Sequence, residues 1–279
     1  MKKRFMIPIA VAVIFLATGA FFSYKAYRQY MTIETIRIDP YCTVYLGGGG
    51  NSMALIAEDH SNTLLVDTKM GIAAKELKKI ITDTNVIVVN THNHRDHVEG
   101  NALYLHAKLI AGAYTPQDWL RGAKTGRYPD ETINPGEEKI IRIGSETVHI
   151  RNMGQAHTKN DVVVYCEQRK LLMTGDIVFL GTHPVLFSQS GCNIASWIMV
   201  LDSLKNRYDA AYVIPGHGKI TDGRGITAMK EYFVSIDSSI GQPEMQAQLR
   251  KRYKNYFSVP GMSSFEKTLD FIRSQREGK

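Results

Sequence analysis

The stretch THNHRDHVEG, residues 91–100, places three histidines and one aspartate within six positions. It follows the apolar run VIVVN, which predicts a short buried strand. In an extended chain, side chains two positions apart point the same way, so His92 and His94 are spaced to bind one metal ion. Asp96 and His97 follow where the chain turns toward a helix, and they are spaced to face a second ion. The stretch therefore predicts a two-metal site at the C-terminal end of a strand.

Two metal ions need more ligands than these four residues, and three later residues are candidates. Each follows an apolar strand or lies in a turn with glycine, which allows the backbone to approach closely. They are His157 in GQAHTKND, Asp176 in LLMTGDIVF and His217 in VIPGHG.

In this order, the motifs THNHRDH, QAHT, TGD and PGHG resemble those of the metallo-β-lactamase superfamily, over about residues 43–218. The resemblance implies an α/β fold, the αββα sandwich, with the site at one edge of two packed sheets. It also implies the ligands: His92, His94 and His157 for the first metal, Asp96, His97 and His217 for the second, and Asp176 as the bridge. The stretches LLMTGDIVFLGTHP and GCNIASWIMVLDSL are similar to the glyoxalase II type of hydrolase.

The sequence departs from the superfamily pattern at two places. Ala156 stands where glycine usually precedes the third histidine, and its small side chain is compatible with the same ligand geometry. The residues VDTKM stand where an Asp-Thr-Gly turn is usual, which is expected to alter the surroundings of Asp67. The run GGGGN at 47–51 is expected to form a flexible hairpin tip, and its position resembles the mobile flap of some superfamily members.

The ligand set predicts hydrolytic chemistry. Divalent ions make hydroxide available at neutral pH and polarise a carbonyl, so we expect a bridging hydroxide to attack an ester, thioester, lactone or amide of a small molecule. Asp96 and Asp176 are the expected catalytic carboxylates. Two zinc ions are expected, although iron and manganese also suit histidine and carboxylate ligands.

Three other functions remain open from the sequence. A true β-lactamase usually has cysteine or serine contributing where this chain has Asp176. A persulfide dioxygenase of the same fold uses one iron and shares most of the ligands. A binding protein that keeps the metal site only for stability is the non-enzymatic alternative.

Residues 1–30 differ in composition from the rest of the chain. An uncharged run from Phe5 to Tyr24 lies between basic residues and predicts a hydrophobic helix that serves as a membrane anchor or a cleaved signal. The basic flank before the run places the domain at 31–279 outside the cytoplasm, either anchored or secreted. Five of the basic residues lie in this segment, which leaves +2 of the formal +7 charge for the domain and argues against nucleic-acid binding.

Apolar runs and helical spacing predict the remaining elements. Hairpins are expected at 53–57 with 63–66 and at 140–143 with 147–150; strands at 86–89, 162–165, 170–173 and 211–214; and helices at 71–82, at 193–206 with Asn193 as cap, and from about 222 onward. The segment 113–137 is expected to be a surface excursion or a lid, and His183 is a candidate for the pocket wall. Three cysteines without paired spacing predict at most one disulfide.

Overall fold

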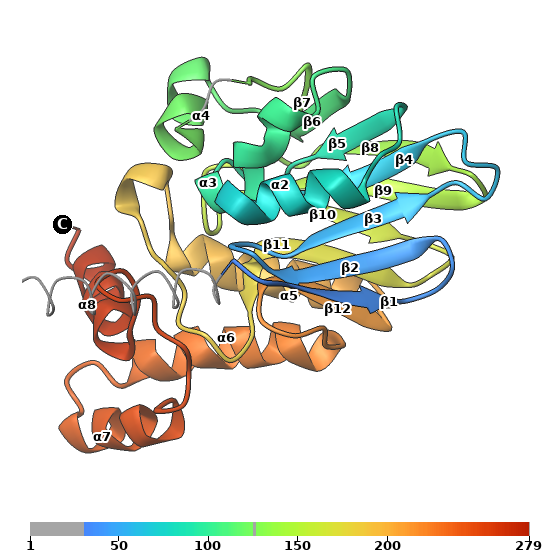
Figure 1. Ribbon diagram of the computed structural model, residues 1–279. Helices are drawn as coiled ribbons and strands as arrows, with labels where there is room; N and C mark the ends of the chain where they lie inside the picture. The colour runs from blue at the N-terminus through green and yellow to red at the C-terminus, as the bar shows by residue number, and fades with distance from the viewer. Residues whose placement is uncertain (1–30, 125–126, 279) are drawn as a thin grey trace, which may run out of the picture.

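The computed structural model describes residues 31–124 and 127–278. These residues form two β-sheets that pack face to face, with helices on the outer side of each sheet (Figure 1). The expected mixed α/β sandwich is therefore confirmed. The expected N-terminal hydrophobic helix lies outside the described residues, and within the described part no helix is long and apolar enough to cross a membrane.

The first sheet has seven strands in chain order. Its strands β1 to β4 pair antiparallel, and β4 to β7 pair parallel. They are β1 Ile33–Arg37, β2 Cys42–Gly47, β3 Ser52–Ile56, β4 Thr63–Val66, β5 Val86–Val89, β6 Lys108–Gly112 and β7 Glu131–Ile133.

The second sheet has five strands in the order β12-β11-β10-β9-β8. Its strands pair antiparallel except for β11 and β12, which run parallel. They are β8 Glu138–Ile143, β9 Glu146–Gly154, β10 Asp161–Cys166, β11 Leu171–Phe179 and β12 Tyr212–His217.

The helices cover the outer faces and one edge of the sandwich (Figure 1). Helix α2 packs on the first sheet, and helices α5 and α6 pack on the second. The helices are α2 Gly71–Ile80, α3 Arg95–Val98, η1 Glu99–Leu103, α4 Pro116–Ala123, η2 Ser188–Ser190, α5 Ile194–Arg207, α6 Gly223–Ser238, α7 Pro243–Arg252 and α8 Phe265–Arg276.

The main core lies between the two sheets. Leu64 and Val89 of the first sheet belong to the same buried cluster as Ile150 and Val164 of the second. Along β9 buried and partly exposed residues alternate, which is the period expected of a strand with one face in the core. This rigid base leaves the turns at one edge of the sandwich to carry polar side chains.

The strands and helices predicted from the sequence are confirmed, with differences at their ends. Strand β5 has the predicted bounds, and the Asn193 side chain accepts a hydrogen bond from the Ser196 N–H at the start of α5. Strand β11 is longer than expected because it continues through Thr174, Gly175 and Asp176, which resemble a turn in the sequence. The segment 113–137 is more regular than expected, because it contains α4 and β7.

The run at 47–51 forms the expected hairpin tip, because it joins the antiparallel strands β2 and β3, but the expected flexibility is wrong. Residues Gly48 to Asn51 are buried, and the Asn51 side chain donates hydrogen bonds to the carbonyls of Pro215 and Gly218 in the second sheet. The loop is packed because Gly50 lies directly against the His97 ring. A Cβ added at Gly50 would lie 2.4 Å from the His97 ring, so only glycine fits there.

Candidate metal centre

The structure brings together all seven side chains that the sequence singled out, at the edge of the sandwich where β5, β11 and β12 end. Five of them lie in short segments next to sheet strands, whereas Asp176 lies within β11 and His217 is the last residue of β12. The two sheets together therefore position the cluster. The donor atoms form two groups, each within 4.8 Å: His92, His94, His157 and Asp176 in one, and Asp96, His97 and His217 in the other.

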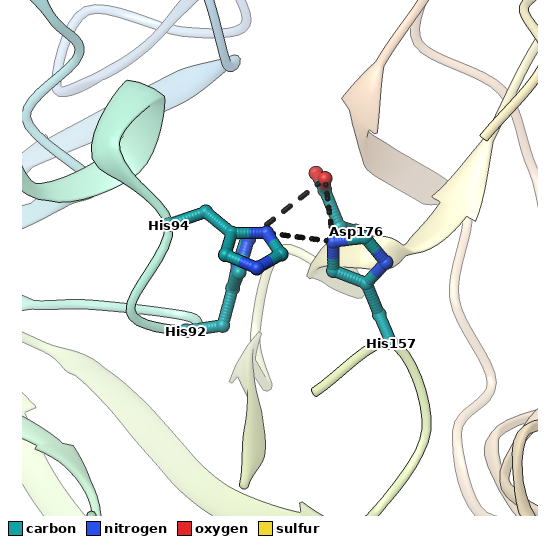
Figure 2. A group of neighbouring side chains, drawn as sticks. All are labelled: His92, His94, His157 and Asp176. Carbon is teal, nitrogen blue, oxygen red and sulfur yellow. Dashed lines mark hydrogen bonds and ion pairs between the residues drawn. The ribbon is translucent and has the colours of Figure 1, made fainter. Parts of the chain in front are cut away.

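The first group consists of three imidazoles around one carboxylate oxygen (Figure 2). Nε2 of His157 lies 2.9 Å from Nδ1 of His94 and 3.2 Å from Oδ2 of Asp176. Nε2 of His92 lies 3.8 Å from the same Asp176 oxygen. Three nitrogens and one oxygen at these distances match the ligand types of a tetrahedral zinc site.

The second group uses the other oxygen of Asp176. Oδ1 of Asp176 lies 3.1 Å from Nε2 of His97 and 3.5 Å from Nε2 of His217. Oδ2 of Asp96 lies 3.3 Å from Nε2 of His217. Asp176 thus presents one carboxylate oxygen to each group, which is the arrangement of a residue between two ions.

Buried atoms without partners support metal binding. Nε2 of His92, Nε2 of His97 and Oδ1 of Asp176 are buried and make no well-directed hydrogen bond within the described part of the chain, and the last two face each other only as an ion pair at 3.1 Å. Leaving such groups unpaired is costly, whereas a divalent cation would satisfy all three. The residues present therefore fit metal ions in both groups.

Hydrogen bonds behind the ligands fix their orientation. Asp67 accepts at 2.7 Å from Nδ1 of His97, which leaves Nε2 of that ring as the lone-pair donor. Asp67 also accepts from the N–H and the hydroxyl of Thr91, each at 2.8 Å. Ser190 Oγ lies 3.0 Å from Nε2 of His94 on the outer side of the cluster. Ser190 and Thr91 were not predicted, since a lone hydroxyl residue carries no signal in the sequence.

The two groups differ in proton affinity. Burial lowers the pKa of His92, and it lowers that of His94 to about 3, so both rings are neutral lone-pair donors. Burial also acts to lower the pKa of His217, but the Asp176 and Asp96 carboxylates outweigh it and raise the pKa to about 9. The pKa of Asp176 lies well below its usual range, because nearby His217 and His97 outweigh the effect of burial. His92, His94 and Asp176 therefore have charge states that suit binding of a cation. His217 would first have to lose a proton.

The unusual VDTKM segment has a structural role. Lys69 is fully buried in the left-handed region, at a φ of 62°, and its ammonium donates to the carbonyls of Tyr45, Gly47 and Gly50. Burial lowers the pKa of Lys69 to about 7, against the opposing effect of the Asp67 and Asp96 carboxylates. Lys69 therefore holds the glycine loop in place beside His97, while the contacts of Asp67 with the cluster are kept.

A large cavity opens above the metal centre. Its volume is about 1100 Å³, and its lining includes His94, Asp96 and Asp176. The loop at 181–190 and the α4 region supply much of the wall, and His183 lies in that wall as expected. The His183 ring is held by the Tyr232 hydroxyl, 2.7 Å from Nδ1.

The three cysteines are buried free thiols in the structure. Burial raises the pKa of Cys42 to about 12 and also raises that of Cys192, so neither is a ready thiolate ligand. No disulfide contributes to this fold among the described residues.

Comparison with known proteins identifies the family of the chain. The profile of the Metallo-beta-lactamase superfamily matches residues 46–217. The chain is 25% identical over 177 residues to a metallo-beta-lactamase type 2 of Bacillus cereus, which covers 63% of this chain and 66% of that protein. It is 27% identical over 203 residues to a mitochondrial hydroxyacylglutathione hydrolase of Saccharomyces cerevisiae, which covers 66% of this chain and 67% of that one.

The fold is shared with solved structures. A metallo-beta-lactamase from Pontibacter korlensis superposes with a TM-score of 0.61 at 21% identity, over 72% of this chain and 99% of that one. This chain thus spans slightly less than two thirds of the Bacillus cereus protein but nearly all of the superposed structure. By its fold and by the match over residues 46–217, the chain belongs to the metallo-β-lactamase superfamily.

Proposed function

We propose that the protein is a dinuclear metallohydrolase, with zinc as the expected metal, that cleaves an ester, thioester, lactone or amide of a small molecule. The observation that carries the proposal is the division of the Asp176 carboxylate between the two groups of donors. When bound, divalent ions supply Lewis-acid chemistry: they lower the pKa of a water molecule toward 7 and polarise a carbonyl.

The chain's own residues complete the site. Asp176 and Asp96 supply the negative charge that balances the ions, and Asp67 keeps His97 in the tautomer that offers Nε2. The Phe179 ring stacks on His217, with ring centroids 5.2 Å apart, and packs against one face of that ligand. The site thereby places a polar centre beside apolar protein, where electrostatic effects on a substrate are stronger than in water.

The first test is metal content of the purified full-length protein, measured together with hydrolysis of thioesters, esters, lactones and β-lactams. We expect about two zinc ions per chain. In His94→Ala and Asp176→Ala we expect metal and hydrolysis to be lost together. His106→Ala is the matched control, because His106 is exposed and outside both groups.

Other outcomes would favour the alternatives. The named relatives include both β-lactamases and hydroxyacylglutathione hydrolases, so the bond that is cleaved decides between a β-lactamase and the proposed glyoxalase II-like subgroup. One iron with oxygen uptake and no hydrolysis would indicate a dioxygenase. Unfolding on metal removal with no hydrolysis of any substrate would indicate a metal-stabilised binding protein.

We also propose that the domain lies outside the cytoplasm, anchored by residues 1–30 or released after their cleavage. The support is the uncharged run Phe5 to Tyr24 with its basic flanks, in a segment outside the described residues. Fractionation of expressing cells with N-terminal sequencing of the product distinguishes the two forms, and recovery of the uncleaved chain in the cytosol would refute both.

A further inference from the structure

The cavity is larger than a small acyl substrate needs. Pockets for small molecules usually measure about 300–1000 Å³, and this one measures about 1100 Å³. Beyond the metal centre, its lining includes apolar side chains from four separate segments: Leu46; Met70; Leu180, Val185 and Phe187; and Phe257, Val259 and Met262.

The apolar surface begins at the metal ligands themselves. The Phe187 ring contacts His94 edge to face, with centroids 5.6 Å apart, and the Phe179 ring is stacked on His217. Leu180 and Val185, from the chain between these two rings, also line the cavity. When the reactive group of a substrate lies at the metal centre, the neighbouring part of the substrate therefore contacts apolar side chains.

The outer end of the cavity is built by the turn before α8. Phe257 donates its N–H to the Gly181 carbonyl and accepts from the His183 N–H, both at 2.9 Å, so its backbone is fixed against the 181–190 loop. The turn at 259–263 is closed on itself, because the Ser263 Oγ accepts from the Val259 N–H. The backbone that carries Phe257 and Met262 is thus fixed by hydrogen bonds.

Two side chains in this wall are exposed although they are large and apolar. Phe257 is 53% exposed and Met262 is 46% exposed, and both line the cavity. Grouped exposed apolar side chains beside a cavity mark a ligand-binding surface, since covering them removes apolar area from water. The turn also lies outside residues 46–217, the part of the chain that the superfamily profile matches.

We propose that the substrate carries an extended apolar acyl chain, as an acyl ester, thioester or amide, and that this chain extends from the metal centre past Phe187 to Phe257 and Met262. The proposal rests on the proposed hydrolase function and adds to it the class of substrate. Polar short acyl groups would leave the outer wall in water and lose the contribution of its burial.

A chain-length series tests the proposal. We expect kcat/KM of the metal-loaded full-length protein to rise about two- to fourfold per added methylene from acetyl to octanoyl p-nitrophenyl esters, because each buried methylene gains apolar transfer energy. Concentrations stay below those at which the esters form micelles. Calorimetry gives a second readout: decanoate is expected to bind at least about tenfold more tightly than acetate, since both offer the same carboxylate to the metals.

Matched variants locate the chain. In Met262→Gln and Phe257→Asn we expect the octanoyl-to-acetyl ratio of kcat/KM to fall about tenfold, with a parallel loss in decanoate binding. Met199→Gln is the control, because Met199 is 65% exposed and lies on α5 away from the cavity lining. A ratio that is unchanged in the cavity variants, or lowered equally in the control, overturns the assigned position.

Two results separate the failure of each proposal. Hydrolysis of all esters at equal kcat/KM, with acetate and decanoate bound equally, overturns the apolar substrate class and leaves the hydrolase in place. No hydrolysis at any chain length by the protein with both metals bound overturns the hydrolase function, and the substrate class with it.

Discussion

At the scale of single residues, the arrangement around Asp67 shows how the ligands are held. Its two oxygens accept three hydrogen bonds, two from Thr91 and one from His97, in a fully buried position. Because Oδ2 of Asp67 accepts a hydrogen bond from the Nδ1–H of His97, the Nε2 atom of that ring can face a metal. Asp67 is thus a positioning residue for the second group and not a ligand.

Replacing Asp67 by asparagine should weaken metal binding at the second group. An amide nitrogen toward Nδ1 would favour the wrong His97 tautomer, and loss of such a partner typically costs about 10- to 100-fold in metal affinity. Titration with a competing chelator should show weaker binding of the second ion and near-normal binding of the first. Asp83→Asn, which loses a carboxylate that accepts from Thr63 away from the site, is the control. Equal affinities in Asp67→Asn and the wild type would refute the positioning role.

The proton on His217 makes metal binding dependent on pH. In the metal-free protein the pKa of His217 is raised to about 9. The charged ring therefore stabilises the metal-free fold fully below about pH 6.5, and this stabilisation is lost as the pH rises through about 9. A metal must displace the proton below about pH 9 but not above it. Calorimetry in buffers of different ionisation enthalpy should therefore show at least about one more proton released per chain at about pH 7 than at about pH 10. Equal proton release at both pH values would contradict the raised pKa.

At the scale of elements, the loop between β2 and β3 depends on a residue far from it in sequence. Lys69 donates to the carbonyls of Tyr45 and Gly47 at the end of β2 and of Gly50 in the loop, and the loop in turn has no space for side chains beside His97. A neutral amine has only two N–H groups, so all three bonds require the ammonium. The rigidity of the glycine run is therefore supplied by Lys69.

Removing this amine should loosen the loop. We expect Lys69→Met to lower the free energy of unfolding by about 3 kcal/mol, because three buried carbonyls lose their donor. Urea unfolding followed by circular dichroism measures the change, and Lys75→Met, an exposed lysine of α2, is the control. An unfolding midpoint equal to that of the wild type would show that the loop keeps its conformation without the Lys69 ammonium.

The sequence predicted most elements but not this loop. Strands such as β5 and helices such as α5 follow from apolar runs and a cap, which are local signals. The spacing within THNHRDH indicated four of the side chains that meet, and the resemblance to the superfamily motifs implied the other three. The contact of Lys69 with Gly50 joins segments 19 residues apart and has no local pattern, so the glycine run was read as flexible. Strands β1, β2, β6 and β7 and the turn at 257–262 were not predicted either.

At the scale of the whole molecule, the metal centre joins the two sheets. His92, His94, Asp96 and His97 follow β5 of the first sheet, whereas His157, Asp176 and His217 belong to the second. Ions bound there would link the two halves of the sandwich across its edge. Metal binding and stability of the fold are therefore expected to be coupled.

Metal removal should lower the melting temperature. For each ion present at about 1,000 times its Kd, we expect a loss of about 4 kcal/mol, or roughly 10 °C for a domain of this size. Scanning calorimetry with and without a chelator measures the shift, and added zinc should reverse it. Asp176→Asn, which lacks the shared carboxylate, should respond little to the chelator. An unchanged melting temperature after complete metal removal would show that the sheets hold together without the ions.

The turn at 257–262 lies on the wall of the cavity but outside the segment shared with the superfamily. Its contacts with the rest of the wall are made mainly through backbone groups at Gly181 and His183, which tolerate changes of side chain. Sequence drift in these few positions would thus alter what enters the cavity without disturbing the ligands. Under the two proposals, substrate preference is therefore expected to change more readily than the reaction, because the side chains of this turn do not hold the metal ligands.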